Sequence, residues 1–337
     1  MENRARVDEH KKPVHLEQLL EYFAGLLSPL EAAELPKVVP CDEPILYIMG
    51  CARSGTSLVY EYLCRSGLFT YPTNLVSRFY YAPYLGARLQ EMLFDVDFQG
   101  EMQIARNDEA FSSRLGKTRG ILSPHEFWYF WRRFFEFGED QLLEEASFDP
   151  TKGVEFIREL RAFQSVKWLP LVLKGMMLNW NIPYLASLYD RSCFLFVRRE
   201  TMANAESLVR TREEFFGDVR KWYSFKPPGF CSVLHLEPQE QAIWQVLETN
   251  AAIQCGLTQL CASQIFEVDY EEFCHDPWVV IEQIGERWKK PLPRPDCDLP
   301  RSFEVRTRNN QCGIDWDAAI QRARSFATQR VDAANVE

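Results

Sequence analysis

A short glycine-bearing loop between two apolar segments constrains the fold of this chain more than any other feature. The loop GCARSGTS, residues 50–57, follows the apolar run PILYIM and precedes LVYEYLCRSG, which predicts a strand, a tight loop and a helix start. Two glycines followed by hydroxyl residues outline a phosphate-binding P-loop. However, Thr56 stands where a nucleotide triphosphatase has its lysine, and the cation Arg53 comes three residues earlier. The loop therefore predicts either an anion site of another kind or a plain strand-to-helix turn.

Three further apolar runs predict buried strands, and each of them precedes a helical pattern. They are LPLVLKG, SCFLFVR and QIFEVDY, which end at residues 175, 198 and 270. This alternation is typical of an α/β fold in which helices flank a parallel β-sheet, here of the P-loop nucleotide-binding type. In such a fold, ligands bind at the carboxyl ends of the strands.

The spacing of these runs predicts how the chain is organised. Residues 1–43 form an N-terminal helical leader, 44–325 a single domain, and 326–337 a frayed tail. Within the domain, residues 78–165 are a large and mainly helical insertion after the first strand and helix. The insertion is rich in aromatic residues, which either pack in a core or line a substrate cleft.

Charge and cysteine usage limit the class of protein and its location. The net charge of −10 argues against binding to nucleic acid, because that requires a clustered basic surface. The ten cysteines have no metal-like spacing, which predicts reduced thiols and a cytoplasmic protein without a metal site. The start of the chain lacks the apolar stretch of a signal peptide, and no apolar run reaches the roughly 18 residues of a membrane-spanning helix.

A second candidate anion site follows the third apolar run. Arg199 stands at the carboxyl end of this predicted strand, and Ser207 lies about two turns along the next predicted helix. An arginine in this position can share an anion with a hydroxyl on the same helix face. Arginine and serine are also common at strand ends, so the pair alone is equally consistent with an ordinary surface.

Together, the two segments resemble the sulfotransferase family, whose donor is 3'-phosphoadenosine 5'-phosphosulfate. ARSGTS is similar to the family's 5'-phosphosulfate loop, and RETMANAES to the segment whose Arg and Ser bind the 3'-phosphate. LVLKG, with Lys174, is similar to the strand that carries an active-site lysine. VDYEEFCHDP and RTRNNQCGIDW are looser matches to later segments, so the resemblance extends from residue 44 to 316.

The resemblance implies a sulfotransferase enzyme, closest to bacterial-type members, that needs no metal. The donor-binding residues that it implies are Arg53, Ser54, Gly55, Thr56, Ser57, Arg199, Ser207, Tyr270, Arg306 and Arg308. Two positions depart from the common pattern without removing a phosphate ligand. The loop has Cys51-Ala52 where many members have a proline, and Glu200-Thr201 stands where Asp-Pro is commoner.

The resemblance also implies the catalytic groups. Arg53 and Lys174 would stabilise the leaving phosphate, and a base would take the proton of the acceptor. Two neighbours in SPHEF, His125 and Glu126, compete for the role of base, and similarity to the bacterial type favours Glu126. The same segment also has the pattern of a structural capping box, with Ser123 as N-cap and Glu126 at the third helical position.

The acceptor and two alternative functions remain open at this point. The acceptor is expected to be a hydroxyl or amine of a small molecule, glycan or lipid, and the oligomeric state is not readable. A P-loop kinase-like enzyme would need an aspartate at a strand end, and Asp269 is the residue that could serve. A non-catalytic nucleotide-binding protein would keep both anion sites without the chemistry.

Overall fold

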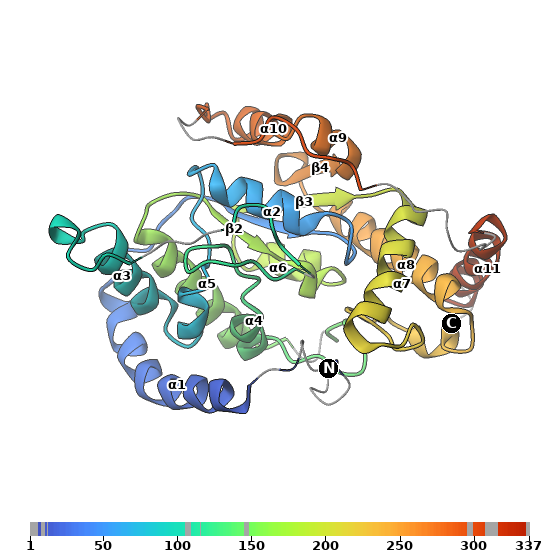
Figure 1. The fold of residues 1–337 in the computed structure, drawn as a ribbon, viewed down its shortest axis with the longest axis horizontal. Coiled ribbons are helices and arrows are strands. Elements are labelled where there is room, and N and C mark those ends of the chain that lie inside the picture. Colours follow the sequence, from blue (N-terminus) through green and yellow to red (C-terminus); the bar gives the residue numbers. More distant parts are fainter. Residues whose placement is uncertain are drawn as a thin grey trace.

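A four-stranded parallel sheet forms the centre of the molecule. The computed structural model describes residues 6–7, 11, 13–104, 109–114, 116–144, 148–294, 299–306 and 316–334. The strands lie in the order β2-β1-β3-β4, and all neighbours are parallel. They are β1 (Ile45–Met49), β2 (Leu171–Lys174), β3 (Ser192–Arg198) and β4 (Ile265–Asp269). The α/β fold and the four strands expected from the sequence are thereby confirmed (Figure 1).

Both faces of the sheet are buried at β1, β2 and β3, whereas β4 exposes Glu267. Ile45, Tyr47 and Met49 belong to one apolar cluster, whereas Leu46 and Ile48 belong to a second cluster on the other face. Successive side chains of a strand point to opposite faces, so a strand covered on both sides reads as a continuous apolar run. This is why these strands were recognisable in the sequence.

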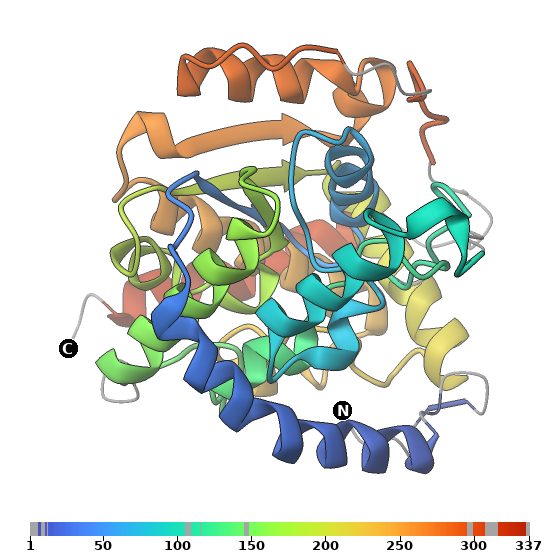
Figure 2. The same ribbon diagram turned by 90° about the vertical axis from the view of Figure 1, so that its left-hand side faces the viewer.

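Helices cover the two faces unequally. The smaller cluster contains residues of α2 (Thr56–Arg65), α9 (Tyr270–His275) and α10 (Trp278–Trp288). Figure 2 shows α9 and α10 above the sheet and the N-terminal helix at the opposite side of the molecule. The larger cluster packs against the other face and draws on α4 (Trp128–Phe134), α5 (Pro150–Ser165), α6 (Ile182–Ser187), α7 (Thr201–Phe216) and α8 (Pro238–Leu257).

The insertion between β1 and β2 is less helical than the sequence predicts. Besides α4 and α5 it contains α3 (Pro83–Phe94), but most of the described residues between α3 and α4 are irregular. Gly116 and Gly120 have φ angles of 80° and 114°, which a helix cannot accommodate. Of the aromatic side chains, Phe130, Trp131 and Phe156 are fully buried, so these three belong to the core rather than to a cleft.

The helices at the two ends of the chain pack on the outside of this core. The leader contains α1 (Val14–Glu34), and α11 (Trp316–Ala334) continues past residue 326, where the sequence predicts a frayed tail. The domain boundaries themselves stay predictions. Among the described residues, no helix combines the length and apolar character needed to cross a membrane. The eight cysteines in the described part of the chain are free thiols.

Candidate functional site

The glycine-bearing loop leaves the carboxyl end of β1 and enters α2. Gly55 is the residue before α2 and has a φ of 97°, a left-handed conformation that glycine adopts without steric cost. A Cβ atom on Gly55 would overlap the ring of Tyr270, so the close packing also requires a glycine here. Arg53 also has a positive φ, of 70°. The loop is therefore a tightly folded cradle at the N-terminus of α2, where backbone N–H groups favour an anion.

Two buried asparagines hold the loop in place. The Nδ2 group of Asn179 donates to the carbonyl oxygen of Gly50 at 2.9 Å, and that of Asn204 donates to the oxygen of Ala52 at 2.8 Å. The sequence analysis missed both residues. Asn204 lies three residues before Ser207 and so on the same helix face, which was a usable signal. Nothing in the sequence around Asn179 singles it out.

Lys174, Glu126 and Ser57 meet beside the loop. Lys174 ends β2 and its side chain is 6% exposed. The Nζ group donates to Ser57 Oγ at 3.0 Å and forms an ion pair with Glu126. The other carboxylate oxygen of Glu126 accepts a hydrogen bond from the Trp128 indole. Three residues that the sequence indicated separately thus form one hydrogen-bonded group at the carboxyl edge of the sheet.

The capping box expected at SPHEF is wrong. Helix α4 begins only at Trp128, and Phe127 precedes it in a left-handed conformation. Ser123 Oγ donates to the carbonyl of Arg119 instead of capping a helix. The physical reason is a short antiparallel pairing of residues 124 and 73, joined by the hydrogen bond from His125 N to the oxygen of Pro72, which keeps the segment extended.

The two candidate bases are held differently. Glu126 forms an ion pair with Lys174, whereas His125 Nδ1 accepts a hydrogen bond from the backbone N–H of Phe127, two residues later, at 2.9 Å. Gly116 comes close to Glu126, because a Cβ atom there would lie 2.6 Å from Glu126 Oε1. The described contacts thus place Glu126, and not His125, in the group with Lys174.

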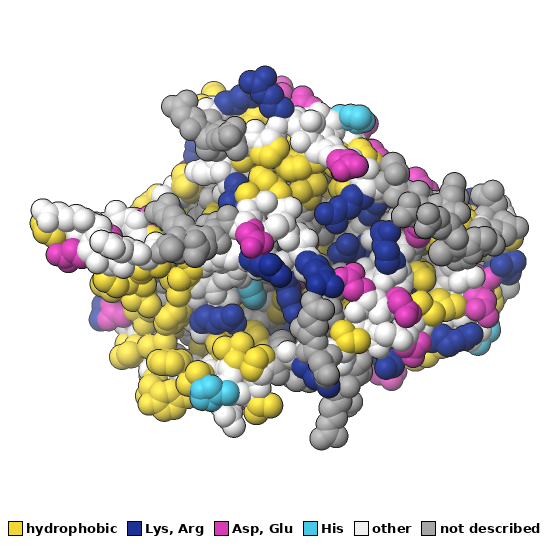
Figure 3. All heavy atoms as spheres, in the orientation of Figure 1, with side chains coloured by type: hydrophobic (Ala, Val, Ile, Leu, Met, Phe, Trp, Pro, Cys, Tyr) yellow, Lys and Arg dark blue, Asp and Glu magenta, His cyan; other side chains and the backbone are white. Residues whose placement is uncertain are grey.

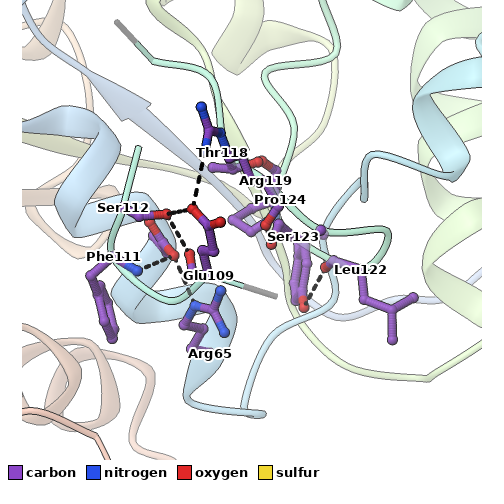
Figure 4. A network of polar contacts seen from close by, with 12 residues as sticks. Arg65, Glu109, Phe111, Ser112, Thr118, Arg119, Leu122, Ser123 and Pro124 are labelled. Atoms are coloured by element: carbon purple, nitrogen blue, oxygen red, sulfur yellow. Dashed lines mark hydrogen bonds and ion pairs between the residues drawn. The ribbon is translucent and has the colours of Figure 1, made fainter. Parts of the chain in front are cut away.

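The segment that leads to Glu126 is fastened by a network of polar contacts (Figure 4). Thr118 Oγ1 donates to the oxygen of Pro124 at 2.7 Å, and Glu109 lies 3.6 Å from Arg119. The first contact links Thr118 to the residue two positions before Glu126, and the second joins Glu109 to Arg119. Part of the irregular insertion is thus fastened to the segment that carries Glu126.

The second expected anion site lies directly beside the first. Arg53 Nε donates to Ser207 Oγ at 3.3 Å. The Arg199 guanidinium donates to the carbonyl oxygens of Arg53 and Arg306, and lies 4.8 Å from the centre of the Tyr270 ring. The structure thus brings together five of the predicted donor residues from four separate segments. Arg308 lies outside the described residues.

The site has an excess of positive charge. Burial lowers the pKa of Arg53, and the neighbouring charges of Arg306 and Arg199 lower it further. Burial likewise lowers the pKa of Arg199. Figure 3 shows Lys and Arg side chains gathered over the carboxyl end of β3 and the start of α7, although the chain as a whole is acidic. An anion bound here would relieve this repulsion.

The hydroxyl groups of the loop fit the same interpretation in part. Ser54 Oγ is buried and has no hydrogen-bond partner among the described residues, as expected of a hydroxyl group that bonds a ligand. Thr56 Oγ1, in contrast, donates to the sulfur of Met176.

Tyr223 was missed by the sequence analysis. Burial raises the pKa of its hydroxyl group to about 12; the charge of Arg53 lowers this pKa and that of Glu126 raises it. Tyr223 therefore lies close enough to both site residues to be affected by their charges.

Comparisons with known proteins agree with this geometry. The profile described as "Sulfotransferase family" matches residues 44–293. The solved sulfotransferase STF9 from Mycobacterium avium is similar, with 15% identity over 78% of this chain and 68% of that chain, and a TM-score of 0.50. STF1 from Mycobacterium tuberculosis H37Rv has 13% identity over 80% of this chain and 74% of that chain, and a TM-score of 0.48. A sulfotransferase from Alicyclobacillus acidocaldarius has 16% identity over 84% and 95%, with a TM-score of 0.39.

The family match covers more than half of the chain, and the likeness to STF9 supports the fold. A comparison with curated protein sequences finds no match. The chain therefore belongs to the sulfotransferase family and is a sulfotransferase enzyme.

Proposed function

We propose that the enzyme transfers a sulfuryl group from 3'-phosphoadenosine 5'-phosphosulfate to a hydroxyl or amine of a small-molecule, glycan or lipid acceptor. The observation that carries the proposal is the joining of two cationic groups at one edge of the sheet. Arg53 belongs to the loop and yet bonds Ser207 of α7, so the two groups form one continuous site with room for an anion at each group. A donor with one phosphate at each end of its ribose matches this arrangement.

In this proposal, the two groups bind different parts of the donor. Arg199 and Ser207, together with Tyr270 and Arg306, would hold the 3'-phosphate, and residues 53–57 would hold the 5'-phosphosulfate. The lowered pKa values of Arg53 and Arg199 support it, because burial disfavours their charged forms more than the nearby charges of Glu214 and Glu271 favour them, and a bound anion would offset this. The unpartnered Ser54 hydroxyl, buried next to Arg53, supports it as well.

The proposed chemistry is a direct displacement at sulfur. The acceptor oxygen or nitrogen attacks the sulfur atom, the bond from sulfur to the phosphate oxygen breaks, and adenosine 3',5'-bisphosphate leaves. Lys174 and Arg53 would stabilise the charge that develops on the leaving phosphate. Glu126 would take the acceptor proton, because its carboxylate lies beside Lys174, and His125 is the alternative base.

Metal-free catalysis and a cytoplasmic location remain predictions. The kinase-like alternative loses support, because the Asp269 carboxylate forms an ion pair with Arg198 at 3.2 Å and is not directed to the loop by any described contact. A non-catalytic protein would need no group such as Lys174 and Glu126 beside its phosphate loop.

The proposal is tested by titration calorimetry with adenosine 3',5'-bisphosphate in the presence and absence of Mg²⁺. We expect equally tight binding in both, whereas a kinase-like site would need the metal. Transfer of labelled sulfate from the donor is then screened across phenols, glycans, sterols and lipids. Binding without transfer to any acceptor class would favour the non-catalytic alternative.

A further inference from the structure

A cavity lies away from the candidate active site. It is a cavity of about 560 Å³ at the C-terminal end of α2, bordered by α3 and α5. This volume is within the range of about 300–1,000 Å³ that is typical of small-molecule sites. Its wall is mixed: polar groups expose somewhat more of it than apolar ones, and the aromatic and aliphatic side chains include Phe69, Tyr71, Phe111, Leu122, Phe163 and Leu169. Figure 4 shows Phe111, Arg65 and Leu122 from close by.

The cavity and the donor loop lie at opposite ends of the same elements. Arg65, which lines the cavity, is the last residue of α2, and Thr56 of the loop is the first. At 1.5 Å per residue, this separates their Cα atoms by roughly 13 Å. Leu169 lines the cavity just before β2 begins, whereas Lys174 ends that strand. The cavity is therefore separate from the proposed donor site.

A backbone wall separates the cavity from Glu126. The segment 72–75 is hydrogen-bonded to the segment 121–125, through His125 N to the oxygen of Pro72, Asn74 N to that of Ser123, and Leu75 N to that of Ile121. Leu122 and Thr73 of these segments line the cavity. Glu126 lies beyond the end of this pairing, where it meets Lys174.

The charges in the cavity wall are already compensated. Arg65 Nε pairs with the buried carboxylate of Glu61 at 2.9 Å, and Lys167 pairs with Asp95. A ligand with a full charge would have to compete with these pairs, so an uncharged ligand is favoured. Polar groups are also present, since Thr73 Oγ1 bonds Gln90 Oε1 at 2.5 Å within the wall.

We propose that this cavity binds an uncharged small molecule that combines an apolar part with several hydrogen-bonding groups. The aromatic and aliphatic side chains would contact its apolar part, and Thr70, Thr73 or Gln90 would bond its polar groups. The molecule would contact Leu122, four residues before Glu126. The proposal does not depend on the donor or the acceptor of the sulfotransferase reaction.

The test uses N-phenyl-1-naphthylamine, an uncharged fluorophore whose emission rises in apolar surroundings. We expect saturable binding of one probe per chain, which adenosine 3',5'-bisphosphate does not displace. Val166→Trp fills the cavity from the end of α5 and should weaken probe binding at least tenfold. The control is Val154→Trp, at a position of the same helix that is 68% exposed, which should bind the probe like the parent protein.

A second variant guards against misfolding of the first. Ala110 lines the cavity but is exposed, so Ala110→Phe obstructs it without disturbing the core, and it should also weaken probe binding at least tenfold. Both variants should keep the bisphosphate affinity of the parent. Unchanged probe affinity in Ala110→Phe, or displacement of the probe by the bisphosphate, would overturn the proposal.

Discussion

The ion pair between Lys174 and Glu126 explains how a lysine is tolerated in a buried strand. All four residues of β2 are buried, and a lysine in such a place is costly unless its charge is compensated. Glu126 supplies the opposite charge, and Ser57 accepts a further hydrogen bond. The sequence indicated each of these residues, but not their contact, because Glu126 and Lys174 are 48 positions apart, with α4 and α5 between them.

The first prediction concerns the choice between the two candidate bases. Glu126→Gln keeps an acceptor oxygen for the Trp128 indole but cannot take a proton, so turnover should fall by about 10²–10⁴. Bisphosphate affinity should stay near that of the parent, which shows that the loop is intact. His125→Gln is the matched variant and should have a mild effect. The assignment is reversed if His125→Gln is the inactive protein, and a base elsewhere is indicated if both variants turn over normally.

The second prediction concerns the 3'-phosphate residues. Arg199→Ala and Ser207→Ala should weaken binding of the 3'-phosphorylated nucleotide by about 1.5–3 kcal/mol each, the typical contribution of a hydrogen bond to a charged group. Affinity for the matching nucleotide without the 3'-phosphate should hardly change. Calorimetry with both nucleotides measures the difference. An equal loss for both would show that these residues do not contact the 3'-phosphate.

At the scale of elements, the junction of β1, loop and α2 is where sequence and structure agree best. Local chemistry determines this turn, because a glycine must occupy the left-handed position before α2. Tertiary packing adds a second condition, since Tyr270 at the start of α9 closes over Gly55. The sequence could show the first condition but not the second, which joins positions more than 200 residues apart.

The third prediction separates these two conditions with two glycines. Gly55→Ala and Gly67→Ala both place a side chain at a positive φ, of 97° and 72°, at a cost of about 1 kcal/mol. At Gly67 nothing lies within 4 Å of the added Cβ atom, so that variant should bind the bisphosphate normally. At Gly55 the Cβ atom collides with Tyr270, and we expect at least tenfold weaker binding. Similar bisphosphate affinities in the two variants would contradict the prediction and show that the Tyr270 ring moves aside at little cost.

At the scale of the whole molecule, continuous apolar runs were predictable and irregular connections were not. Strands β1, β2 and β3 could be found because they are buried on both faces, whereas β4 exposes Glu267 and is buried at Phe266 and Val268. The two sharp motifs could be placed at the carboxyl ends of β1 and β3. The capping box failed because hydrogen bonds to residues 72–75, a distant segment, override the local preference of Ser123. Asn179 and Tyr223 belong to the site only through contacts with residues far away in the sequence, so no local sequence pattern identifies them.

A buried carboxylate contributes to the packing of α1 on the body of the protein. Glu31 is 1% exposed and accepts hydrogen bonds from Tyr84 N at 2.8 Å and Leu85 N at 3.0 Å, at the start of α3. Burial raises its pKa to about 7, and the charge of Glu159 also raises it, whereas the two backbone N–H groups and Arg133 oppose the shift. In the unfolded chain the same carboxyl group titrates near pH 4.5.

The last prediction follows from this difference in pKa. Between about pH 4.5 and 7 the folded protein binds more protons than the unfolded chain, so the contribution of Glu31 to stability falls as the pH rises. One pKa unit corresponds to about 1.4 kcal/mol, so the total loss is on the order of 3 kcal/mol. Urea unfolding of the parent and Glu31→Gln at pH 5, 6, 7 and 8 measures it. The free energy of unfolding of Glu31→Gln should rise relative to the parent across this range, whatever constant offset the lost acceptor causes. Glu34→Gln, at an exposed position of the same helix, should follow the parent at every pH. If Glu31→Gln also keeps a constant difference from the parent, then Glu31 is already charged at pH 5 in the folded protein, and α1 is docked through an ionised cap.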